Sequence, residues 1–228
     1  MKVIIFLLKE INNSFGELLS FLPGRIGNFV RYFYWRRRFK YCGKNVRIDA
    51  GIKITNPEFI SIGNNVWLDN YCILIAGIGK INLKAENIKI KENKFFKGQK
   101  GELIINDNVH IAPFCLIQAH GGVYIGKNSG LSTSTKIYSY SNLPTNPTDN
   151  SDIIYFTALN KHSYYFLSPV VLEENVGCAI NVIILPGVCV GSNSFIAPNS
   201  VVITSFKENS YLSGNPAKKI SERFNLEK

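Results

Sequence analysis

Apolar residues recur at every sixth position over most of the chain. The hexads I-G-N-N-V-W and L-D-N-Y-C-I start at Ile62, and five consecutive hexads run from Leu172 to Ile196. A spacing of six fits neither the helical period of about 3.6 residues nor the two-residue alternation of a half-buried strand. It is typical of a short strand and a turn repeated at constant length. Position one of fifteen hexads is occupied by Ile62, Leu68, Leu74, Ile105, Ile111, Ile117, Ile125, Leu131, Ile137, Leu172, Cys178, Ile184, Val190, Ile196 and Val202.

This repeat predicts a mainly β fold. Three strand-and-turn units would close one triangular coil, with one side chain pointing inward per unit. Stacked coils would bury a column of Ile, Leu and Val, and each strand would pair in parallel with the coils above and below, roughly 4.8 Å away. Chance alternation in a β-sandwich would not hold this phase over five consecutive hexads.

The hexads resemble those of the hexapeptide-repeat acyltransferases. The string S-G-N-P-A-K-K-I, from Ser213 to Ile220, is similar to the tail of their sugar and maltose O-acetyltransferase branch. The resemblance covers the chain from about Val46 to Ile220. It implies a left-handed parallel β-helix over residues 46–206 and a C-terminal tail over residues 207–228. It also implies acetyl-coenzyme A as the donor, a homotrimer, and acceptor sites between neighbouring β-helices.

Residues 1–45 lack hexads and mix aromatic with basic side chains. We expect one or two amphipathic helices there, interrupted at Pro23-Gly24. Two interpretations stay open: the helices cap the open end of the coils and hide its unpaired edge, or their basic aromatic face lies on an anionic membrane surface. The apolar run from Val3 to Leu8 is too short for a secretory or membrane-spanning segment. We therefore expect a cytoplasmic protein, peripheral at the inner face of the membrane under the second interpretation.

Three further segments break the period. Residues 76–104 are rich in lysine and predict one distorted coil with a solvated loop, and Gly121-Gly122 inserts a slip of two residues. The longest break is an insertion at residues 143–169. A loop of that length in a compact solenoid is more often functional than decorative. It would wall an acceptor site or pack on a neighbouring subunit.

Acyl transfer from a thioester to an alcohol needs a general base near the hydroxyl, and histidine suits this role near neutral pH. In the maltose acetyltransferase branch the catalytic histidine follows an I-Y-[ST]-x-x string, where this chain carries Asn142. The hexads of Ile117 and Ile137 are three repeats apart once the slip is allowed for. His120 is therefore predicted at the same corner of the coil as Tyr140 and Asn142.

The string A-H-G-G-V-Y-I-G, which starts at Ala119, resembles a segment of polysaccharide-type O-acetyltransferases. We predict His120 as the general base and His162, on the insertion, as the alternative, and we give His110 a structural role. The three histidines are 10 and 42 residues apart. This spacing does not match the metal-binding histidines of the γ-class carbonic anhydrases, which share the fold, so we expect no metal.

The composition shows an excess of positive charge, and the sequence lacks the motifs of several other classes of site. The chain has 228 residues, of which 26 are Lys or Arg and 16 are Asp or Glu, giving a net charge of +10. This excess favours an anionic partner or surface. The five cysteines are scattered without a C-x-x-C pair, which favours a reducing compartment over a disulfide framework. No phosphate-binding loop or dinucleotide fingerprint is present, and we expect no nucleic acid as a partner.

The resemblance implies that coenzyme A lies along the C-terminal coils, at the matching positions Ala179, Ala197, Thr204, Ser205 and Lys218, with Lys219 adjacent. For a carbohydrate acceptor we expect stacking on aromatic rings and hydroxyl binding by polar groups, from Tyr140, Asn142, Asp152 and Tyr155. The predicted function is O-acetylation of a sugar, in a surface polysaccharide or its precursor. Two alternatives stay open: a catalytically silent β-helix that binds glycans or acts as a scaffold, and an antibiotic O-acetyltransferase.

Overall fold

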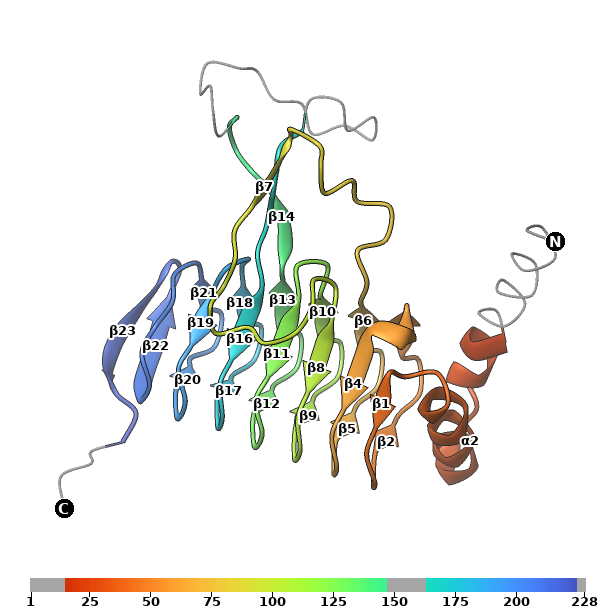
Figure 1. Ribbon diagram of the computed structural model, residues 1–228. Helices are drawn as coiled ribbons and strands as arrows, with labels where there is room; N and C mark the ends of the chain where they lie inside the picture. The colour runs from red at the N-terminus through yellow and green to blue at the C-terminus, as the bar shows by residue number, and fades with distance from the viewer. Residues whose placement is uncertain (1–14, 147–162, 225–228) are drawn as a thin grey trace.

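Three sheets, whose strands are parallel except for the last one, form the body of the protein. A computed structural model describes residues 15–146 and 163–224 (Figure 1). Sheet A contains β1 (Tyr41–Cys42), β4 (Ile60–Ile62), β8 (Leu103–Ile105), β11 (Val123–Ile125), β16 (Val170–Leu172) and β19 (Cys189–Val190). Sheet B contains β2 (Arg47–Ile48), β5 (Trp67–Leu68), β9 (His110–Ile111), β12 (Gly130–Leu131), β17 (Gly177–Cys178), β20 (Phe195–Ile196), β22 (Ser210–Gly214) and β23 (Ala217–Glu222). Sheet C contains β3 (Lys53–Thr55), β6 (Ile73–Ile75), β10 (Leu116–Gln118), β13 (Lys136–Tyr138), β18 (Ile183–Ile184) and β21 (Val201–Val202).

The chain visits the three sheets in rotation, so that one strand from each makes a coil. The position-one residues of the hexads pair with one another between coils: Ile62 lies opposite Ile105, and Ile105 lies opposite Ile125. These side chains are fully or almost fully buried. The predicted aliphatic column is therefore the core of the protein.

Asparagines hold the corner between sheets A and B. Asn65, Asn108 and Asn128 adopt the left-handed backbone conformation, which Asn tolerates better than most residues. Their amides form a ladder between coils: Asn65 Nδ2 donates to Asn108 Oδ1 at 3.0 Å, and Asn108 Nδ2 donates to Asn128 Oδ1 at 2.9 Å. Each turn is thus tied to the same turn of the next coil.

The parallel pairing extends beyond residues 46–206 at both ends. β1 pairs with β4 from Tyr41, and β22 pairs with β20 as far as Leu212. A short 3-10 helix, Pro57–Phe59, precedes β4. The last strand, β23, runs antiparallel to β22 and ends the stack.

Residues 76–104 add no coil, so that prediction is wrong. Residues 76–102 leave the stack between β6 and β8, and their strand β7 (Ile88–Ile90) pairs with β15 (Tyr165–Leu167) instead. β15 also pairs with β14 (Tyr140–Asn142), which gives a small three-stranded sheet, sheet D. Figure 1 shows sheet D projecting from the side of the stack.

Helices cover the end of the stack where the chain begins (Figure 1). Residues 15–20 are helical, and α2 (Gly24–Arg36) starts directly after Pro23, where the sequence predicted an interruption. α2 buries Gly27, Arg31, Tyr34 and Trp35. The capping interpretation of the N-terminal segment therefore holds.

Arg31 makes the main polar contact of this cap. It is 1% exposed; its Nε donates to the carbonyl of Ile48 in β2 at 2.8 Å, and its Nη1 donates to the carbonyl of Leu22 at 2.6 Å. Burial lowers the pKa of Arg31, while the charge of Asp49 opposes that shift. The guanidinium thus supplies a donor to the Ile48 carbonyl at the edge of sheet B and ties this edge to the segment before α2.

We expect Arg31→Ala to lower the free energy of unfolding by about 2–4 kcal/mol, because the buried Ile48 carbonyl would lose its donor and the hydrogen bond to the Leu22 carbonyl would also be lost. The exposed Arg37 is a matched control, and Arg37→Ala should change stability by no more than about 0.5 kcal/mol. Urea denaturation of both variants measures the difference. Equal losses would mean that Arg31 is not the contact that holds the cap.

Candidate functional site

All three internal irregularities of the coil lie at one corner, where the chain passes from sheet C to sheet A. Residues 76–102 leave there after β6, the Gly121-Gly122 slip follows β10, and the long insertion follows β13. These three strands are neighbours in sheet C. The corner between sheets C and A is therefore the place where non-repetitive residues gather.

His120 lies at this corner, directly after β10. Its Nδ1 is 2.6 Å from the carbonyl oxygen of Gly77, which comes from the preceding coil. A carbonyl can only accept a hydrogen bond, so Nδ1 carries the proton and Nε2 of the neutral ring has a free lone pair. Gly79 passes close by, since a Cβ placed there would lie 4.0 Å from His120 Cε1. The ring is half-buried and held in one orientation.

Two tyrosines continue the site into sheet D. The ring of Tyr140 meets His120 edge to face at 5.9 Å and stacks on Tyr165 at 4.9 Å. Burial raises the pKa of Tyr140 to about 12, and Tyr165 adds to the shift. The Tyr140 hydroxyl consequently stays protonated at neutral pH and can donate a hydrogen bond.

The two glycines after His120 are required by the turn. The N–H of Gly122 donates to the carbonyl of Ala119 at 2.9 Å, and Gly122 has φ of +108°. The N–H of Gly121 donates to Ser139 Oγ at 2.9 Å, and a Cβ at Gly121 would lie 2.5 Å from the Ser139 carbonyl oxygen. The slip thus packs the histidine turn directly onto the next coil.

Only one of the other predicted acceptor residues, Asn142, lies within the described part of the chain. Asn142 is exposed at the end of β14, opposite Tyr165 in sheet D. Asp152, Tyr155 and His162 lie outside the described residues. His110 lies on sheet B, where its ring stacks on Trp67 at 4.4 Å and its Nε2 is 3.4 Å from Asp69 Oδ2.

The predicted coenzyme A residues fall at three places near the C-terminal end. Thr204 and Ser205 are exposed and follow β21, at the same corner as His120 but three coils further along sheet C. At about 4.8 Å per coil this distance is roughly 14 Å. Ala179 and Ala197 occupy equivalent positions in adjacent coils at the corner between sheets B and C, where Ala179 N donates to Ile196 O and Ala197 N to Leu212 O.

Lys218 and Lys219 are exposed on β23, the last strand. A pocket of about 360 Å³ opens beside Ser205 and is lined by Cys189, Phe206 and Lys207 among others. Burial raises the pKa of Cys189 to about 11, and the charge of Glu173 adds to the shift. Its thiol is therefore protonated at neutral pH, which argues against a nucleophilic cysteine in this pocket.

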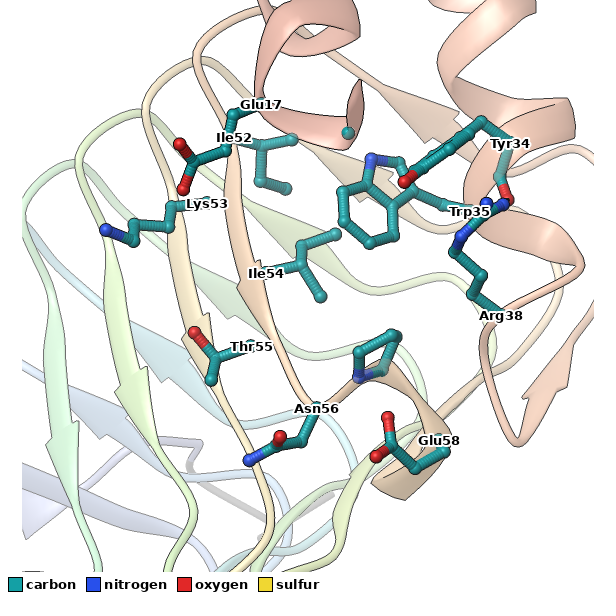
Figure 2. Close-up of a pocket in the computed structure, with 12 residues that line it drawn as sticks. Glu17, Tyr34, Trp35, Arg38, Ile52, Lys53, Ile54, Thr55, Asn56 and Glu58 are labelled. Atoms are coloured by element: carbon teal, nitrogen blue, oxygen red, sulfur yellow. The ribbon is translucent and has the colours of Figure 1, made fainter. Parts of the chain in front are cut away.

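A second pocket, of about 260 Å³, lies at the other end of the same corner, between the N-terminal helices and β3 (Figure 2). Trp35 and Ile54 form apolar walls, and Asn56 links the pocket to the next coil by donating from Nδ2 to the Ala76 carbonyl at 2.8 Å. This pocket, the Gly77 carbonyl and the stacking of Tyr165 were not predicted from the sequence. No periodic signal marks any of them.

Among the side chains in 15–146 and 163–224, no group of three or more His, Cys, Asp or Glu is placed to hold a metal ion. Within the same residues, none of the helices has the length and apolar character needed to cross a bilayer.

No protein-family model matches the chain. A dTDP-4-amino-4,6-dideoxy-D-glucose acyltransferase of Escherichia coli is 30% identical to it over 190 residues, which is 81% of this chain and 83% of that protein. A probable macrolide acetyltransferase of Lysinibacillus sphaericus is 44% identical over 63 residues, which is 28% of this chain and 35% of that protein.

Solved structures agree with these relatives. A variant of AntD, an N-acyltransferase from Bacillus cereus in complex with dTDP and coenzyme A, is 25% identical with a TM-score of 0.62, over 83% of this chain and 87% of that one. A hexapeptide-repeat-containing acetyltransferase from Vibrio cholerae O1 biovar eltor, in complex with acetyl-coenzyme A, is 19% identical with a TM-score of 0.53, over 94% and 86% of the two chains. The second likeness concerns the fold alone.

We expect Gly122→Ala to lower the free energy of unfolding by about 1–3 kcal/mol, because alanine is strained at a φ of +108° and its Cβ would lie 2.5 Å from the Phe96 ring. Gly130→Ala is the matched control. No atom lies within 4 Å of a Cβ at Gly130, so this change should cost nothing or stabilise by up to about 1 kcal/mol. Thermal unfolding compares the two variants, and equal stabilities would contradict the role given to the Gly122 turn.

Proposed function

We propose that this chain, which belongs to the sugar-modifying branch of the hexapeptide-repeat acyltransferases, transfers an acyl group from acyl-coenzyme A to a sugar hydroxyl, with His120 as the general base. The observation that carries the proposal is the hydrogen bond from His120 Nδ1 to the Gly77 carbonyl. It leaves Nε2 as the basic nitrogen at the corner where the irregular segments meet. An imidazole fixed in this tautomer is suited to accept a proton.

The fold in this proposal is a left-handed parallel β-helix. The rotation of the chain through three parallel sheets supports the β-helix, and membership of the family supports the left hand. The chain is organised in this reading as a helical N-terminal segment (1–45), the β-helix with its insertion, and a C-terminal tail.

The donor would lie along the corner between sheets C and A. Thr204 and Ser205 are about 14 Å from the His120 coil on this edge, which is a length that an extended pantetheine arm can span. Lys218 and Lys219 are exposed on β23 and would bind the phosphates of coenzyme A, Lys219 in exchange for its ion pair with Glu222. Ala179 and Ala197 would allow close approach of the ligand at the neighbouring corner. Coenzyme A in complex with AntD supports this choice of donor.

The acceptor would enter beside Tyr140. The stacked rings of Tyr140 and Tyr165 offer an apolar face to a sugar ring. Asn142 on β14, together with Asp152 and Tyr155 on the insertion, would bind sugar hydroxyls. The dTDP-sugar acceptor of the Escherichia coli relative supports a nucleotide-linked sugar, which would serve as a precursor of a surface polysaccharide.

The chemical step follows from the orientation of the ring. Nε2 of His120 takes the proton of the sugar hydroxyl as its oxygen attacks the thioester carbonyl. The resulting oxyanion needs a hydrogen-bond donor, and the protonated hydroxyl of Tyr140, whose ring contacts His120, would supply it. When the carbon–sulfur bond breaks, the imidazolium returns its proton to the departing thiolate. The products are the acyl sugar and free coenzyme A.

N-acylation of an amino sugar is the second candidate. It is favoured by the Escherichia coli relative, whose acceptor is a 4-amino sugar linked to dTDP. The two candidates differ in the attacking atom and share the donor. The catalytically silent module and the antibiotic acetyltransferase are weaker, although the local similarity to a macrolide acetyltransferase keeps a macrolide among the acceptors to test.

We propose further that the active assembly is a homotrimer and that it works in the cytoplasm. A site at an exposed corner of one β-helix gains a second wall when another copy packs alongside. The pocket beside Ser205 and the exposed Ile180 and Ile203 lie on the C-terminal coils where such packing would occur.

The proposed function is tested by following release of free coenzyme A thiol from acetyl-coenzyme A. The acceptors are dTDP-linked sugars carrying either a hydroxyl or an amine at position 4, unlinked sugars and a macrolide. We expect turnover with a nucleotide-linked sugar hydroxyl. Turnover with the amine alone would replace the proposal by N-acylation. No turnover together with no binding of coenzyme A in calorimetry would favour the silent module.

For His120→Ala we expect a loss of about 10²–10⁴-fold in the rate of acyl transfer, the usual contribution of a positioned general base. Coenzyme A affinity should barely change, because the imidazole acts on the acceptor proton. His110→Ala is the matched control and should retain the rate, since His110 stacks on Trp67 on a different face. Loss of activity in His162→Ala with activity retained in His120→Ala would assign the base to the insertion.

A further inference from the structure

Large apolar side chains are concentrated on the outside of the N-terminal cap. Fifteen large hydrophobic residues are exposed in the described parts of the chain, and six of them fall within residues 15–29. We call these six the N-terminal apolar surface: Phe15, Leu18, Phe21, Leu22, Ile26 and Phe29. Exposed apolar residues scattered singly need no explanation, whereas a group of this size marks an interaction site.

α2 is apolar on two opposite faces. One face buries Tyr34 and Trp35 against the end of the coils. With about 3.6 residues per turn, Ile26 and Phe29 fall on the opposite face, where they are 78% and 64% exposed. The ring of Phe29 also contacts Phe33, at 4.5 Å. The packing of the cap therefore accounts for one apolar face only.

Arginines border the outward face. On the helical wheel Arg25 and Arg36 lie on one flank of Phe29, and Arg37 follows on the other flank; all three are exposed. Glu17 is the one acidic residue between residues 15 and 37. Apolar side chains that enter an acyl layer, with arginines placed at its rim, are the features of a helix that lies in the interface of an anionic membrane.

The charge of this border decides between a membrane and a second copy of the chain. A two-fold contact between two such surfaces would bring like charges together, which is unfavourable. Anionic lipid headgroups are complementary to the same arginines, and the net charge of +10 adds long-range attraction. Figure 1 shows α2 at the end of the stack where the chain begins.

We infer that the N-terminal apolar surface docks this protein onto an anionic lipid bilayer, with Ile26 and Phe29 inserted among the lipids and Arg25, Arg36 and Arg37 at the headgroups. The inference is independent of the proposed function. It assigns the outward face of α2 to the membrane and its inward face to the cap, so both interpretations of the N-terminal segment apply.

The test is co-sedimentation of the purified full-length chain with vesicles of phosphatidylcholine, with and without phosphatidylserine. We expect binding to the anionic vesicles, weakened by salt because screening shortens the reach of the arginines. Arg25→Gln with Arg36→Gln should weaken binding about 25-fold, at about fivefold for each cation near the surface. Lys97→Gln with Lys207→Gln removes the same charge elsewhere and should change binding much less.

The apolar contribution is tested by Ile26→Ser with Phe29→Ser, which should reduce vesicle binding by at least about tenfold. The control is Ile220→Ser with Phe224→Ser at the opposite end of the stack, where these side chains are 62% and 42% exposed. It should bind like the unchanged chain. Because all four positions are exposed, circular dichroism and the rate with a soluble acceptor should be unchanged in both variants.

Three results would overturn the inference. The first is equal binding of the two apolar variants, and the second is equal binding to vesicles with and without phosphatidylserine. The third is a smaller assembly of Ile26→Ser with Phe29→Ser in light scattering, which would make this surface a contact between copies. Failure of vesicle binding with retained acyl transfer would reject the docking surface and leave the proposed function intact.

Discussion

Each coil must bring the chain back into register with the coil before it, displaced by one strand spacing along the stack. The rest of the structure depends on this constraint. Residues of one hexad position, such as Leu74, Ile117 and Ile137, pair directly with one another through sheet C. An extra residue within a strand would turn the aliphatic side chains outward. Additional residues can therefore leave the stack only at corners. In three successive coils the additional residues leave at the same corner. Residues that are remote in the sequence therefore meet around His120.

The hexads were sufficient to predict the aliphatic core and to put His120 at the corner of Tyr140, because a strict period turns sequence distance into position. The hexads gave no information on contacts made by residues of the aperiodic segments. Gly77, which fixes the His120 ring, lies in the irregular segment 43 residues earlier. The hexads also do not predict strand β7, because its pairing with β15 joins two aperiodic segments. Neither contact has a local signature in the sequence.

The N-terminal segment illustrates a different limit. Its composition suits both a packed cap and an interfacial helix, because aromatic residues serve either purpose. The aromatic residues of the cap and those of the outward surface lie on different faces of the helix. Trp35 points toward the coils, whereas Phe29, six residues earlier, faces outward. The length of α2 and its start after Pro23 decide this helical phase. The amino-acid composition of the segment alone could not reveal that α2 carries both the cap face and the outward apolar face.

A stack of parallel strands has two open ends, and in principle each end could template the addition of another molecule. At one end of the stack, the Arg31 guanidinium donates a hydrogen bond to the Ile48 carbonyl. At the other end β23 reverses direction and presents Lys218, Lys219 and Glu222 along the last edge. Charged edge strands discourage further pairing. Both ends of sheet B are therefore poor templates for the pairing of a second copy, and the length of that sheet is set within one chain.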